Sequence, residues 1–218
     1  MTITKSDIPR GLNVSVIDHP LVGYWLSILR DTRTESPLFR AALRELTMML
    51  IYEASRHLST CQAPIETPVA PTFAVRLSNP PLLVPILRAG LGMAEPAQAL
   101  IPQSEMGFVG LARDEATLLA SLYMKSLPYD LSGRSAYVLD PMLATGGSMI
   151  QTAKLLAARG AADITAICAL AAPEGLEALA KSGLPVRVVT ASIDERLNES
   201  GYIVPGLGDA GDRQFGAI

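Results

Sequence analysis

The sequence predicts an α/β protein with a mostly parallel central sheet flanked by helices. Short, almost wholly apolar segments lie at residues 82–87, 107–113, 136–139, 164–171 and 186–190. This is the pattern of strands that are buried on both faces. Helical segments alternate with them, as in consecutive βαβ units. No internal repeat or low-complexity linker separates the segments, so the whole chain, 1–218, is interpreted as one domain with a small subregion.

The first third of the chain is expected to be helical. Apolar residues at helical spacing predict a helix from Pro20 to about Asp31. Ser36 followed by Pro37 has the form of an N-cap with proline in the first helical position. The apolar stripe behind this pair indicates a second helix that runs to about His57.

Other segments are less regular. Residues 1–18 show no clear period and are interpreted as an irregular N-terminal arm. Residues 61–81 are rich in proline and threonine and indicate short strands or an extended excursion. Residues 118–127 fit either a strand pair or a mobile flap. A later helix is predicted over 148–159, with Gly160 as the residue that ends it.

Composition excludes several classes of protein. The formal net charge of −3 over 218 residues gives no general attraction for nucleic acid or anionic membrane. There is no signal-peptide core and no run of about 20 apolar residues, so we expect neither export nor a membrane anchor. Cys61 and Cys168 make no disulfide framework, which favours a reducing cytoplasm. With His19 and His57 they give no zinc spacing, so any metal should be a hard cation bound by oxygens.

The strongest motif spans residues 136–148. A buried strand ends in Asp140, and a short loop then leads to Thr145-Gly146-Gly147-Ser148 at the start of a helix. Glycines let the backbone turn its N–H groups inward, and with the hydroxyls and the helix N-terminus they can bind a phosphate. The alternative is a plain strand–helix connection with Ser148 as cap. Asp140 favours a site, because open α/β sheets bind ligands at the carboxyl ends of their strands. No lysine follows the glycines, which excludes a Walker A loop.

This order of strand, acid, loop and Thr-Gly-Gly-Ser resembles the 5-phosphoribosyl 1-pyrophosphate (PRPP) signature of the type I phosphoribosyltransferases. Many of them carry two adjacent acids, whereas proline follows Asp140 here, which is similar to the uracil phosphoribosyltransferase branch. The resemblance implies the type I fold, with a small base-binding hood or flap. It also implies that one continuous set of residues binds PRPP: Asp140, Pro141, Met142, Leu143, Ala144, Thr145, Gly146, Gly147 and Ser148.

A second motif runs from Val84 through Arg88 to Gly92. Gly90 and Gly92 would allow an anion to approach the backbone closely, while Arg88 supplies a charge that can bond in a bidentate manner. The alternative is a strand–turn–helix corner with a surface arginine. The segment is similar to the pyrophosphate loop of the same family, in which an arginine corresponding to Arg113 also meets pyrophosphate. Taken alone, Arg113 beside its aspartate is a surface ion pair.

The C-terminal segment, 199–218, contains a misleading match. Residues 206–211 fit the dinucleotide fingerprint, but we expect no room for the required helix and following strand. The longer string is similar to the base-binding loop of the uracil phosphoribosyltransferases. The resemblance implies that Ile203, Gly208 and Ala210 bind uracil, largely through main-chain groups, and that Asp209 lies beside uracil, PRPP and the metal.

The resemblance implies an enzyme that joins uracil to the ribose of PRPP, giving UMP and pyrophosphate. Asp140, Arg88 and Asp209 are the candidate catalytic residues. Mg²⁺ is expected to be held mainly by PRPP, with a water-mediated contact to Asp209. GTP activates some relatives and is a candidate effector. We expect a homodimer or higher homo-oligomer, and the run from Met48 to Ile51 is interpreted as core or subunit interface.

Two alternatives stay open. A relative of the same fold could be an RNA-binding regulator of pyrimidine genes, which the acidic charge balance disfavours. A non-catalytic nucleotide-binding protein is also conceivable, but both Arg88 and Asp140 are present. Within the predicted flap, the usual Glu-Pro is replaced by Leu119-Ala120, Lys125 stands one place early, and Tyr123 is kept.

Overall fold

The computed structural model describes residues 9–113 and 120–217, without the side chains of Arg113 and Ala120. Its centre is an eight-stranded sheet in the order β1-β10-β9-β7-β4-β5-β6, with the short β8 also paired to β9. The strands pair in parallel, except that β6 runs antiparallel to β5. The bounds are β1 Asn13–Val16, β4 Leu82–Leu87, β5 Phe108–Arg113, β6 Ala120–Ser126, β7 Ser135–Leu139, β8 Met142–Leu143, β9 Asp163–Ala171 and β10 Val186–Ile193.

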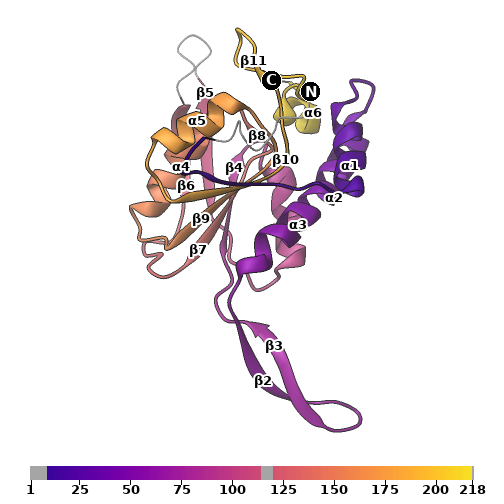
Figure 1. Ribbon diagram of the computed structural model, residues 1–218, viewed down its shortest axis with the longest axis vertical. Coiled ribbons are helices and arrows are strands. Elements are labelled where there is room, and N and C mark those ends of the chain that lie inside the picture. Colours follow the sequence, from indigo (N-terminus) through magenta and orange to yellow (C-terminus); the bar gives the residue numbers. More distant parts are fainter. Residues whose placement is uncertain (1–8, 114–119, 218) are drawn as a thin grey trace.

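Helices cover both faces of this sheet, as the sequence predicts (Figure 1). Successive residues of one strand point to opposite faces, so Leu83 joins one hydrophobic cluster while Leu82 and Val84 join the other. One cluster lies under α1, α2 and α3, and the other lies under α4 and α5. The helices are α1 Pro20–Arg30, α2 Ser36–Ala54, α3 Leu91–Leu100, α4 Gly147–Ala157 and α5 Pro173–Lys181.

The structure corrects the prediction for the N-terminal arm. Residues 13–16 form the edge strand β1 and pair in parallel with β10, Val14 opposite Val188. The strand has exposed residues at both ends and no regular alternation of buried positions, so periodicity could not reveal it. Its pairing with β10, far along the sequence, makes it a strand.

The predicted cap of the second helix is also wrong, and so is the Ser148 cap of the alternative interpretation. Glu35 is the N-cap residue of α2, and the hydroxyl of Ser36 instead donates to the Arg213 carbonyl at 2.8 Å. The N-cap residue of α4 is Gly146, so Ser148 does not cap that helix. The predicted end of α4 is close, because Gly160 follows it with a left-handed φ of 84°.

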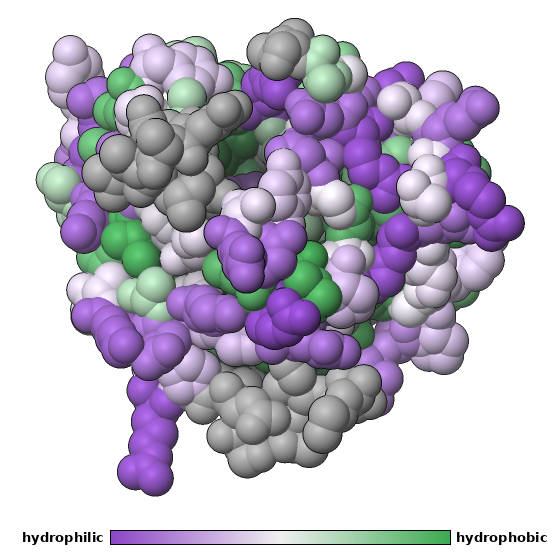
Figure 2. Space-filling model, turned by 90° about the horizontal axis from the view of Figure 1, so that it is seen from above, coloured by the Kyte–Doolittle hydropathy of each residue, from purple (hydrophilic) through white to green (hydrophobic). Residues whose placement is uncertain are grey.

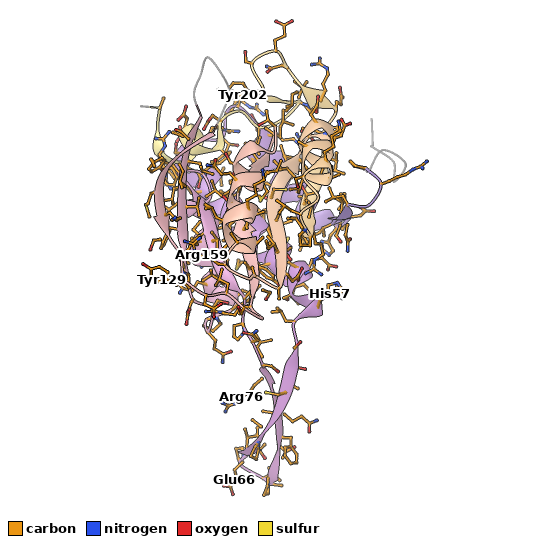
Figure 3. All side chains as sticks on the ribbon, turned by 90° about the vertical axis from the view of Figure 1, so that its left-hand side faces the viewer. His57, Glu66, Arg76, Tyr129, Arg159 and Tyr202 are labelled. Carbon is orange, nitrogen blue, oxygen red and sulfur yellow. The ribbon has the colours of Figure 1, made fainter. Side chains whose placement is uncertain are left out.

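The segment after α2 leaves the body of the protein. A 3-10 turn, η2 Ser55–His57, leads into the antiparallel hairpin of β2 Thr60–Glu66 and β3 Pro71–Leu77, which we call the arm. Figure 3 shows Glu66 near the tip of the arm, Arg76 along it and His57 at its base. The two alternatives expected for this segment, strands or an extended excursion, thus hold together, because the two strands form the arm that leaves the body.

The carboxyl ends of the parallel strands form the opposite edge of the molecule. Beyond β10 the chain forms a small hairpin, β11 Arg196–Leu197 and β12 Ile203–Val204, and then the short helix α6 Ala210–Phe215. Figure 1 places β11 and α6 at the end away from the arm. Of the predicted flap, 120–126 is a strand, while 118–119 lie outside the described residues. None of the described helices has the length and apolar character that a membrane span requires.

Candidate active site

The motif at 136–148 forms a loop that is bonded closely to β9. The N–H of Asp140 donates to the Ile167 carbonyl at 3.2 Å, and the Pro141 carbonyl accepts the N–H groups of Ala169 and Leu170, each at 3.0 Å. Residues 142–143 then continue as β8 beside β9. This bonding fixes the backbone that leads into α4.

Gly146 is required at the turn into α4. Its φ is 82°, a left-handed conformation that costs a residue with a side chain energy. A Cβ there would also lie 3.0 Å from the Gly175 carbonyl oxygen on α5. Gly147 is exposed, and Thr145 and Ser148 are partly exposed. The loop therefore reaches the surface at the start of α4, where the predicted phosphate cradle would lie.

The carboxylate of Asp140 lies directly beyond the carboxyl end of β7, where the sequence places it. One of its oxygens accepts the N–H of Met142 at 3.4 Å, and the residue is half-buried. β4 is the neighbouring strand, with Pro85 opposite Leu139. The loops that follow β4 and β7 must therefore lie side by side at this edge.

The loop after β4 packs against the end of β7. The Leu87–Arg88 peptide bond is cis, and the Gly90 N–H donates to the Ile86 carbonyl at 2.8 Å. A Cβ on Gly90 would lie only 2.2 Å from the Leu139 carbonyl oxygen, so glycine permits this approach. A Cβ on Gly92 would lie 1.8 Å from Oε1 of Gln214. Close packing within the protein explains both glycines, which differs from our interpretation that they admit an anion.

Arg88 faces α6. Its guanidinium donates to the Asp212 carboxylate at 3.1 Å, and both side chains are about two-fifths exposed, at 40% and 42%. An exposed pair of this kind is weak, so Arg88 can exchange this partner for a ligand. Sequence reasoning singled out Arg88 and missed Asp212. Arg113 is the last residue of β5, beside β4, and its side chain lies outside the described part of the chain.

The C-terminal loop reaches the same edge. Gly206 and Gly208 have left-handed φ values of 63° and 79°, and a Cβ on Gly206 would lie 2.1 Å from the Ile203 carbonyl oxygen. Ile203 is buried, and Ala210 is the buried first residue of α6. Asp209 is exposed and is the N-cap of α6, where its carboxylate accepts the Asp212 N–H at 2.9 Å.

The helix α6 corrects one step of the sequence reasoning. A helix does follow the glycine-rich string, although we expected no room for one. It spans six residues and is folded back onto α2, and within the described residues no strand comes after it. The string also follows β12, a two-residue strand paired antiparallel with β11, whereas a dinucleotide-binding loop joins a strand of a parallel βαβ unit to its helix.

A buried ion pair anchors the C-terminal loop, and the sequence analysis missed it. Arg30 at the end of α1 donates to both carboxylate oxygens of Asp194, at 2.6 and 2.7 Å. Asp194 is 4% exposed and also accepts the Gly206 N–H at 2.9 Å, while Arg30 donates to the Gly206 carbonyl at 2.9 Å. The available signal was an acid just beyond a buried strand, the same signal that identified Asp140.

Arg213 is a second anchor. Its guanidinium donates to the carbonyls of Asp31 at 2.7 Å and Leu207 at 3.0 Å, and also to the Leu29 carbonyl. It lies over the Phe39 ring, 4.4 Å from the centroid. Burial lowers the pKa of Arg213 below its usual value, and the nearby Asp31 carboxylate offsets this shift only in part. The turn between α1 and α2 is thereby bonded to the loop that precedes α6.

The carboxylates at this edge fit a metal that arrives with a ligand. In the described part of the chain, no group of three or more His, Cys, Asp and Glu residues could hold an ion by itself. Mg²⁺ often binds through one or two carboxylates together with substrate phosphates, and Asp140 and Asp209 are single carboxylates of this kind. Figure 2 looks down on this end of the molecule and shows a hollow near its middle, with hydrophilic side chains along its right-hand rim.

Comparison with known proteins agrees with this geometry. Residues 16–217 match the family described as uracil phosphoribosyltransferase. A uracil phosphoribosyltransferase of Corynebacterium diphtheriae is 58% identical over 205 residues, which cover 94% of this chain and 97% of that protein. One of Streptomyces avermitilis is 59% identical over 209 residues, covering 94% and 99%.

A solved structure extends the agreement to the fold. The AQ2163 protein of Aquifex aeolicus superposes with a TM-score of 0.90 at 35% identity, over 94% of this chain and 98% of that one. The mostly parallel sheet flanked by helices confirms the type I phosphoribosyltransferase fold that the resemblance implied. With a family match over nearly the whole length and relatives this similar, the chain belongs to the uracil phosphoribosyltransferase family.

Proposed function

We propose that this protein transfers the 5-phosphoribosyl group of PRPP to uracil, forming UMP and pyrophosphate. The observation that carries this is the meeting of three loops at one edge of the sheet. Gly90 packs on the end of β7 beside Asp140, and Arg88 bonds Asp212 in the base-binding segment. A phosphate cradle, a cationic loop and a base-binding loop are the parts that two such substrates need. Nothing in the comparisons favours the RNA-binding alternative.

In the proposed reaction, a ring nitrogen of uracil forms a bond to the anomeric carbon of the ribose. The bond from that carbon to the pyrophosphate oxygen breaks, and the N–H proton of uracil is released. The pyrophosphate gains negative charge as it leaves, so Arg88 and Arg113 stabilise the transition state more than the ground state. Asp140 accepts hydrogen bonds from the ribose hydroxyls, and residues 144–148 bind the 5′-phosphate.

The base is proposed to bind along residues 203–210. The backbone there is fixed, because Asp194 and Arg30 bond both the N–H and the carbonyl of Gly206. Main-chain groups of Ile203, Gly208 and Ala210 are the proposed partners of the uracil edge. Fixed donors and acceptors select a ring with two carbonyl groups, since a mismatched ring would leave a buried group unpaired.

Mg²⁺ is the proposed cofactor, held mainly by PRPP. When bound it neutralises charge on the pyrophosphate. Asp209 is the proposed protein contact, through water. One of its carboxylate oxygens already accepts the Asp212 N–H, so the carboxylate is held in place at the start of α6.

We further propose a homodimer or higher homo-oligomer. The arm exposes Val69, Phe73 and Val75 by 94%, 66% and 73%, and an isolated hairpin is marginally stable in water. Burial of these side chains against another copy would stabilise the arm. Leu50 and Ile51 belong to the core, as one interpretation of that run expected. Sedimentation of wild-type protein and a Phe73→Ser variant tests the proposal, and a wild-type monomer would contradict it.

The working conditions are proposed from the family resemblance and the residues together. The protein is proposed to act in the cytoplasm, where the exposed Cys61 would stay reduced. GTP is proposed as an effector that activates the enzyme. Initial rates with and without GTP test this, and equal rates at subsaturating PRPP would contradict it.

The deciding experiment is to measure UMP formation from uracil and PRPP with purified protein, with and without Mg²⁺. The proposal expects UMP and pyrophosphate in equal amounts, with a rate that falls sharply when the metal is chelated. Absence of UMP at saturating substrates would reject the proposed function. A rate that is indifferent to chelation would reject only the Mg²⁺ part.

A further inference from the structure

A buried glutamine bridges the pyrophosphate loop and the base-binding loop. Gln214 lies on α6 and is 1% exposed. Its Nε2 donates to the carbonyl of Ala89 at 3.0 Å and to the carbonyl of Ala210 at 2.7 Å. Ala89 follows Arg88, and Ala210 is a proposed uracil-binding residue. One side-chain amide therefore bonds the main chain of both proposed substrate sites.

The surroundings hold this amide in place. The main chain at this end of α6 is bonded to α2, since Arg40 donates to the Gln214 carbonyl at 2.7 Å. Gly92 leaves room for the side chain, because a Cβ at that position would lie 1.8 Å from Oε1 of Gln214. Glycine at position 92 is thus what allows the amide of Gln214 to take this position.

Stability alone does not explain a glutamine here. Oε1 is buried and has no hydrogen-bond partner among the described residues. An unpaired buried acceptor costs free energy, and an apolar side chain of similar shape would avoid that cost. The two bonds from Nε2 are what the glutamine adds, and both end on substrate loops.

We propose that Gln214 is a positioning residue that couples the two substrate sites. An anion bound by the loop around Arg88 fixes the Ala89 carbonyl, and Gln214 transmits that position to the start of α6. Uracil then binds to a loop that is already in place. Bound uracil must in turn strengthen the binding of the anion, because a coupling free energy between two sites acts in both directions. This proposal rests on the proposed function.

The ion pair of Arg88 with Asp212 cannot replace this link. Both side chains are about two-fifths exposed, and in the proposed reaction Arg88 exchanges Asp212 for pyrophosphate. Gln214 bonds the main-chain carbonyl of Ala89 and not the side chain of Arg88. The bonds of Gln214 therefore persist when an anion is bound to Arg88. Gln214 is therefore the connection that operates in the loaded enzyme.

The test measures the coupling by equilibrium dialysis with radiolabelled uracil. The dissociation constant is measured with no other ligand and again with saturating magnesium pyrophosphate plus ribose 5-phosphate, which together stand in for PRPP without reacting. The ratio of the two constants is the coupling factor. For the wild type we expect a factor of about 5 or more, within the usual range of coupling between sites.

Two variants remove the link by different routes. Gln214→Leu keeps the bulk and removes both bonds, and Gly92→Ala displaces the amide while retaining glutamine. Each variant should bring the coupling factor to within about twofold of 1. The affinity for uracil without pyrophosphate and ribose 5-phosphate should stay unchanged. Gln214→Ala removes the side chain that the methyl group of Gly92→Ala would displace. The double variant should therefore lose no more coupling than either single variant. Gln98→Leu, at an exposed position on α3, is the control and should keep the wild-type factor.

A merely structural role gives a different result. It would weaken uracil binding under both conditions and leave the ratio as in the wild type, and that result would overturn the proposal. A wild-type factor of 1 would overturn it too. The UMP assay is separate: failure to form UMP rejects the proposed function, whereas normal UMP formation with an unchanged factor in Gln214→Leu rejects the coupling alone.

Discussion

The buried ion pair beneath the base-binding loop makes a quantitative prediction. Arg30→Met keeps much of the side-chain length and removes the guanidinium from Asp194. The aspartate side chain is 3% exposed and would keep only its bonds from Ser192 and the Gly206 N–H. Removing one partner of a buried pair costs about 3–5 kcal/mol. Because 26% of the Arg30 side chain is exposed, water partly screens the remaining charge, and we expect about 2–3 kcal/mol.

The same substitution should affect the two substrates unequally. Arg30 also bonds the Gly206 carbonyl, so its loss releases the base-binding loop but leaves the loops at Arg88 and Asp140 in place. Small displacements of a binding group change rates strongly. We therefore expect KM for uracil to rise about 10-fold, which corresponds to about 1.4 kcal/mol, with KM for PRPP changed less than threefold.

Guanidinium chloride unfolding and two-substrate kinetics measure these effects. Arg44→Met is the matched control, because the Arg44–Glu95 pair is 48% and 69% exposed and should contribute only about 0–1 kcal/mol. If Arg30→Met were no less stable than Arg44→Met, Arg30 would not be an anchor. An equal rise of both KM values would show that it does not act on the base-binding loop.

Four further predictions concern single sites. Asp140→Asn should fold normally but raise the reaction barrier by about 2–4 kcal/mol, and unchanged turnover would remove Asp140 from the mechanism. Arg88→Lys should weaken PRPP binding severely, because an ammonium cannot reproduce the planar fork, so near-normal KM for PRPP would refute the pyrophosphate role. Ala210→Pro should harm uracil use more than Ala210→Ser, since proline is tolerated at the first helical position and removes only the N–H; equal effects would exclude that N–H as a uracil partner. A thiol reagent at pH 8 should modify the exposed Cys61 and spare Cys168, because burial raises the pKa of Cys168 to about 12; two reactive thiols in the native protein would contradict this.

The sequence predicted those parts of the fold that repeat a local pattern. The buried strands and the helices flanking them follow from apolar runs and helical spacing, which each segment carries within itself. β1 was missed because its partner, β10, lies far along the chain and its own residues do not alternate. The Ser36 cap was wrong for a similar reason, since its hydroxyl bonds the distant carbonyl of Arg213.

The candidate site divides in the same way. Asp140, Arg88 and the 145–148 turn follow the ends of β7, β4 and β8, so sequence order was enough to predict that they lie at the same edge of the sheet. The supporting contacts of Arg30 with Asp194, and of Gln214 with Ala89, join residues more than 100 positions apart. No local pattern marks either pair. The space left by Gly92 for Gln214 likewise shows only when α6 is in place.

The account's central claim is that a PRPP site and a loop selective for uracil meet at one edge of the sheet. Initial rates with uracil, cytosine, 5-fluorouracil and hypoxanthine, at one saturating PRPP concentration, test it most directly. Cytosine replaces a carbonyl acceptor with an amino donor, and an unpaired buried group costs about 1–3 kcal/mol, so its rate should be at least about 10-fold lower. 5-Fluorouracil should react, and hypoxanthine should fail on size. If cytosine or hypoxanthine reacted as fast as uracil, the assignment of residues 203–210 to the base would be wrong.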